Sequence, residues 1–79
     1  MSERVPEWQQ AAEDVAALLG DEQRSEEIVR MTTVGLRVAY EGSPEQRAHA
    51  QALVIKMGEH GDDGPKWWTR EVEEYMGWA

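Results

Sequence analysis

The residues with the clearest capacity for chemistry lie in one short segment, EHGDDG, at positions 59–64. Four of its side chains carry oxygen or nitrogen atoms that can bind cations: Glu59, His60, Asp62 and Asp63. An EF-hand loop, in contrast, alternates its oxygen ligands over about twelve residues and ends with a glutamate. Here two acids are adjacent and glycines flank them. We therefore interpret the segment as the approach to a helix, because a helix N-terminus favours nearby negative charge, and we expect no metal.

The histidines also give no basis for a zinc site. His49 and His60 are the only two, and the chain has no cysteine. Zinc ligands on one helix need histidines four residues apart, as in the HExxH motif, which is absent. We expect His49 to lie on the protein surface. The absence of cysteine fits a reducing compartment.

Covalent or acid–base catalysis finds no support in the sequence. The serines at positions 25 and 43 are better explained as helix caps, and no G-x-S-x-G, P-loop or G-x-G-x-x-G motif is present. Adjacent acids on a helix point in different directions, and a chain of 79 residues can hardly enclose an enzyme pocket of about 300–1,000 Å³. We expect no enzymatic activity and no cofactor; a small-molecule or metal-binding enzyme is the most remote alternative.

The charge of the chain restricts its partners. Sixteen acids against eight lysines and arginines give a formal net charge of −8. Direct binding to nucleic acid or to an anionic membrane needs basic patches, so both are disfavoured. No apolar run approaches the roughly 18 residues of a membrane span, and no signal peptide is visible. We therefore expect a cytoplasmic protein whose charge steers it towards a basic partner.

Turn residues and apolar spacing predict one all-α domain, either a small bundle or an orthogonal array of about four short helices. The expected helices span residues 6–19, 22–41, 44–58 and 65–77. In the first, Trp8, Ala11, Ala12, Val15, Leu18 and Leu19 recur on one face, as in an amphipathic helix. Gly20 is expected to end this helix in the left-handed conformation.

The second segment is rich in β-branched residues and would also suit a strand. No other run in the chain could pair with it, and a lone strand leaves its backbone groups without partners. A helix capped by Asp21 or Ser25 is therefore favoured. Arg30 and Arg37 then lie on a narrow polar stripe, where we expect them to pair with nearby acids such as Glu26. The rest of this helix should be mostly buried.

The third helix has the clearest beginning in the sequence. Ser43, Pro44 and Gln46 form a capping box with proline at the first helical position. One face carries Ala48, Ala52 and Ile55, and another carries Ala50, Leu53, Val54 and Met57. Two apolar faces predict a central helix that is packed by neighbours on both sides.

Two stripes divide the fourth helix. The core face is expected to contain Trp68, Val72, Tyr75 and Met76. If the helix continues through Gly77, a second stripe contains Trp67, Glu71, Glu74 and Trp78. Lys66 near the start and Glu73 and Glu74 near the end oppose the helix dipole, which suggests that these acids serve binding. Alternatively, Trp67 and Trp78 fold back over the first helix near Trp8 and seal a thin core.

These features lead to two functional hypotheses. The preferred one is a small acidic protein-interaction module that acts as an inhibitor, adaptor or regulatory subunit on a basic partner surface. It includes the case of a phage or mobile-element inhibitor that occupies a nucleic-acid-binding site. The expected partner-binding residues are Trp67, Trp78, Glu71, Glu74, Asp62 and Asp63. The alternative is a structural helical domain that self-associates as a homodimer.

Overall fold

The computed structural model describes residues 6–20 and 25–79, and these residues are helical or in short connections, with no strand among them. The elements are α1 (Glu7–Leu18), α2 (Glu26–Glu41), α3 (Pro44–Met57), the 3-10 helix η1 (Gly58–Asp63) and α4 (Gly64–Met76). The predicted all-α class is confirmed, and with it the choice of helix over strand for the β-branched second segment.

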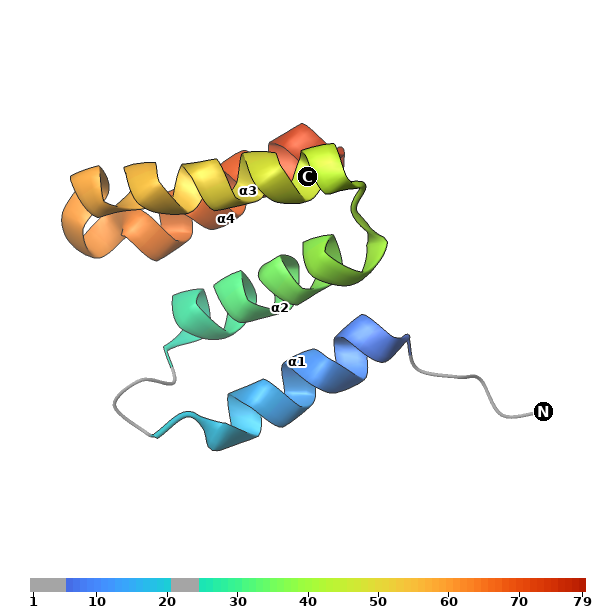
Figure 1. The fold of residues 1–79 in the computed structure, drawn as a ribbon. Coiled ribbons are helices and arrows are strands. Elements are labelled where there is room, and N and C mark those ends of the chain that lie inside the picture. The colour runs from blue at the N-terminus through green and yellow to red at the C-terminus, as the bar shows by residue number, and fades with distance from the viewer. Residues whose placement is uncertain (1–5, 21–24) are drawn as a thin grey trace.

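The central helix is α2, which lies between α1 on one side and the pair of α3 and α4 on the other (Figure 1). α1 packs against α2 and against no other helix, whereas α3 contacts α2, η1 and α4. The prediction that the third helix is central is therefore wrong. Two apolar faces predict two packed faces, but the structure covers only the face with Ala50, Leu53 and Met57.

Local capping signals in the sequence are confirmed. The Ser25 hydroxyl accepts a hydrogen bond of 3.2 Å from the Ile28 N–H at the start of α2. At the start of α3, the Ser43 hydroxyl accepts from the Gln46 N–H at 3.1 Å, and the Gln46 side chain accepts from the Ser43 N–H at 2.8 Å. Asp21, the other expected cap of the second helix, lies outside the described residues.

The end of α1 differs from the prediction. Leu19 is the C-cap and is extended, with φ −73° and ψ 135°, and its N–H donates to the Ala16 carbonyl at 3.2 Å. Positive φ values occur in the described residues only at Gly61 and Gly77. Gly20 therefore does not end α1 in the left-handed conformation, because the chain has already turned extended one residue earlier.

The core is a cluster of five buried side chains from α2, α3 and α4: Val34, Val38, Ala50, Trp68 and Val72. Trp68 is only 4% exposed, and its indole N–H donates to the Ala50 carbonyl at 3.0 Å, which ties α4 to α3. The predicted burial of Trp68 and Val72 is confirmed. Tyr75, in contrast, is 44% exposed and stacks on the ring of exposed His49, so its assignment to the core is wrong.

α1 buries less of its apolar face than its sequence suggests. Ala12 is buried, Trp8 and Leu19 are half-buried, and Leu18 is 84% exposed. The expected apolar face is wider than the surface that α2 offers, and no other helix covers the remainder. The burial expected for Leu18 is therefore wrong.

Candidate protein-interaction surface

The expected second stripe of α4 is interrupted before its last member. α4 ends at Met76, and Gly77 adopts the left-handed conformation with φ 76° and ψ 24°. The Gly77 N–H donates to the Glu74 carbonyl at 3.2 Å and the Trp78 N–H to the Glu73 carbonyl at 2.8 Å, as in a Schellman motif. This turn carries Trp78 off the helical stripe that would have contained it.

Trp78 lies against α2 instead. The guanidinium of Arg37 is 4.0 Å from the centre of the Trp78 ring and 5.2 Å from the centre of the Trp8 ring. Arg37 also donates to Glu41 at 3.0 Å. A cation over an aromatic face is attracted by the quadrupole of the ring. Trp78 is thus half-buried and, through Arg37, connects the end of α4 to α2 and α1.

A double-mutant cycle tests this connection. Arg37→Ala, Trp78→Ala and the double variant are compared with the parent chain by urea denaturation. We expect a coupling energy of about 0.5–2 kcal/mol, because the cation and the ring stabilise each other. Arg37→Lys should recover part of it. Strictly additive losses would show that the two side chains do not interact.

The other expected binding residues occupy different surroundings. Trp67 is half-buried and stacks on the His60 ring at 4.1 Å between centres, and Glu71 is half-buried. Glu74, Asp62 and Asp63 are exposed. The structure therefore leaves these three acids exposed to solvent, whereas both tryptophans contact other side chains of the same chain.

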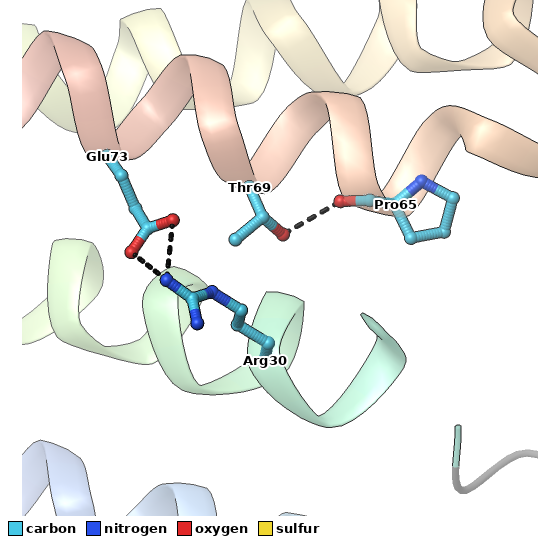
Figure 2. A network of polar contacts seen from close by, with 4 residues as sticks. All are labelled: Arg30, Pro65, Thr69 and Glu73. Carbon is cyan, nitrogen blue, oxygen red and sulfur yellow. Dashed lines mark hydrogen bonds and ion pairs between the residues drawn. The ribbon is translucent and has the colours of Figure 1, made fainter. Parts of the chain in front are cut away.

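Glu73 has a structural explanation for its position near the end of α4. Its carboxylate accepts two hydrogen bonds from the Arg30 Nη2, at 3.1 and 2.8 Å, across the α2–α4 interface (Figure 2). Nearby, the buried Thr69 donates its hydroxyl to the Pro65 carbonyl at 2.7 Å. The sequence predicts that Arg30 pairs with a nearby acid such as Glu26, but in the structure it pairs with the distant Glu73. The position of Glu73 does not require a binding role.

The outward face of α3 is an apolar surface that no part of the described chain covers. A row of four residues runs along it, Glu45, Ala48, Ala52 and Ile55, and Glu59 continues the row in η1, just beyond the end of α3. All five are exposed, and Ile55 is 83% exposed. The buried side of the same helix contains Ala50, with Leu53 and Met57 packed against the core. Because the two rows lie on opposite sides of α3, the fold covers one and leaves the other to solvent. We call the five-residue row the α3 outer row.

Two pockets on the surface of the described residues differ in the side chains that line them. One of about 370 Å³ lies between α2 and α4 and is lined by Glu26, Glu27, Arg30, Lys66, Thr69, Arg70 and Glu73. Another, of about 140 Å³, lies between α2 and α3 and is lined mainly by small apolar groups above Trp68. The first mixes acidic and basic side chains, and the second is small.

Within residues 6–20 and 25–79, no three acids or histidines gather closely enough to hold a metal ion. In the same part of the chain, no helix combines the length and the apolar character needed to span a bilayer. Comparisons with protein-family models, with curated proteins and with solved structures find no match for this chain.

Proposed function

We propose that this chain is an acidic protein-interaction module that binds to a basic surface of a partner protein and acts as an inhibitor, adaptor or regulatory subunit. The observation that supports this most directly is the α3 outer row. It has an apolar centre that no part of the described fold covers, and a glutamate stands at each end.

The apolar centre supplies affinity in this proposal. Full burial of an isoleucine is worth about 1.5–3 kcal/mol relative to exposure, and Ile55 is 83% exposed in the free chain. Single exposed apolar residues are common on protein surfaces. Here, however, Ile55 is aligned with Ala48 and Ala52, which makes a continuous row that a partner could cover.

In this proposal the acids orient the chain on its partner and raise the rate at which the two proteins associate. Glu59, Asp62, Asp63 and Glu74 are all exposed, and the chain carries a net charge of −8. Opposite charges across an interface raise the association rate and exclude wrong partners more than they raise affinity. A site that normally binds nucleic acid is one basic surface of this kind, and occupying it would inhibit the partner. Trp67 and Trp78 already pack within the chain, so we assign the main apolar anchor to Ile55.

Affinity capture from a lysate of the native host tests the proposal. The baits are the parent chain, Ile55→Asp and Leu18→Asp. Leu18 is 84% exposed against 83% for Ile55, and it lies on α1, so the two variants make the same change on different surfaces. We expect the parent chain and Leu18→Asp to recover the same basic protein, and Ile55→Asp to recover at least about tenfold less, since buried apolar anchors carry most interface energy. Equal recovery by all three baits would contradict the proposal.

A further inference from the structure

The geometry of the α3 outer row indicates what kind of element covers it. We infer that the partner places an amphipathic helix along α3, with an apolar centre and a basic residue near each end. This inference rests on the proposed function and specifies its binding mode.

The spacing of the row is that of a coiled-coil seam. Successive positions from Glu45 to Ile55 on α3 are three, four and three residues apart, and Glu59 follows four positions later in η1. Residues that recur every 3.5 positions on average stay aligned along a partner helix if the two helices supercoil slightly. At about 1.5 Å per residue, the α-helical part of the row, from Glu45 to Ile55, is roughly 15 Å long, which matches about three turns of a partner helix.

The sizes of the side chains favour a close approach. Two of the three apolar members, Ala48 and Ala52, have small side chains. Small residues let two helix axes approach to about 8 Å, at the short end of the usual range. The partner helix should therefore present large apolar side chains over the two alanines. It should present smaller ones opposite Ile55.

The charges oppose a second copy of this chain as the occupant. An antiparallel copy would bring Glu45 of one chain near Glu59 of the other, and a parallel copy would bring like residues together. Either arrangement adds repulsion between two chains that each carry −8, whereas lysine or arginine at the ends of a partner helix would be attracted. Exposed Lys56 flanks the row, and an acid on the partner helix would suit that position.

A designed peptide provides the probe. It is a 21-residue helix with leucine at the seam positions that face Ala48 and Ala52, alanine at the position that faces Ile55, and lysine at both ends of the seam. Its control has the same seam and glutamate at the ends. Binding is measured by calorimetry with the parent chain, Ile55→Asp and Leu18→Asp. We expect the lysine peptide to bind the parent chain and Leu18→Asp equally, and Ile55→Asp at least about tenfold more weakly. Amide chemical shifts should change mainly along residues 44–59, and circular dichroism should show both variants folded.

Several outcomes would overturn the helical partner. One is that Ile55→Asp and Leu18→Asp weaken binding of the lysine peptide equally; another is that the glutamate peptide binds the parent chain as tightly as the lysine peptide does. The others are chemical-shift changes concentrated outside α3 and no binding of the lysine peptide to the parent chain. Sedimentation that shows a dimer of the parent chain, lost in Ile55→Asp, would identify a second copy as the occupant instead. If the lysine peptide does not bind the parent chain while capture from the lysate still depends on Ile55, only the helical binding mode is wrong. If capture also fails, the proposed function fails with it.

Discussion

Replacing Trp68 with alanine is expected to lower the free energy of unfolding by about 3–5 kcal/mol, the usual loss for a large aromatic side chain removed from a core. Trp68 is 4% exposed and lies among Val34, Val38, Ala50 and Val72. Its loss would leave a cavity where three helices meet. It would also remove the hydrogen bond that its indole donates to the Ala50 carbonyl.

Such a loss is large for this chain. Domains have a total stability of roughly 0.05–0.15 kcal/mol per residue, and this one has 79 residues. We therefore expect Trp68→Ala to be substantially unfolded at room temperature, as measured by far-ultraviolet circular dichroism in increasing urea. Trp67→Ala is the control, because the neighbouring indole is only half-buried. If Trp67→Ala is equally unfolded, Trp68 does not have the special place in the core that we assign to it.

A pair of glycine substitutions is expected to change stability in opposite directions. A Cβ atom at Gly64 would meet the Met57 carbonyl oxygen at 2.8 Å and the Met57 Cγ at 2.7 Å. The side chain can move, but the carbonyl belongs to the backbone of α3. Gly64→Ala should therefore lower the free energy of unfolding by about 1–3 kcal/mol, as overpacking usually does.

Gly58→Ala is the matched control, six positions earlier. Gly58 has right-handed helical angles, φ −59° and ψ −25°, and a Cβ there would meet nothing within 4 Å. Alanine at such a site restricts the unfolded chain without strain and should stabilise by about 0.4–1 kcal/mol. Urea denaturation of both variants gives the comparison. A loss at Gly58 as large as that at Gly64 would show that chain flexibility at this junction, and not the close approach of α4 to α3, requires the glycines.

The sequence predicts part of the proposed interaction surface but not its exposure. The sequence identifies Ala48, Ala52 and Ile55 as one apolar face, because the spacing of residues on a helix is fixed by its geometry. It does not show that this face stays exposed while the opposite one is buried. That depends on where α2 and α4 lie, which is set by the sum of packing contacts between distant segments.

The C-terminal tryptophans show the same limit. Trp67 and Trp78 are spaced for one helical stripe, and exposed indoles would suggest an interface. A single glycine at position 77 ends the helix and redirects Trp78 towards Arg37. The propensity of Gly77 for a left-handed turn is a local signal, but the side chain that receives Trp78 comes from another helix.

The features of this protein that its sequence predicts correctly are local ones: the all-α class, the capped starts of α2 and α3, the burial of Trp68 and Val72, and the acidic charge. Each follows from interactions between residues a few positions apart or from composition. Three other features become visible once the helices are packed: α2 is central, Arg30 pairs with Glu73, and the α3 outer row is left to solvent. These features depend on which faces of distant helices meet, and that choice is made by the packing of the whole core.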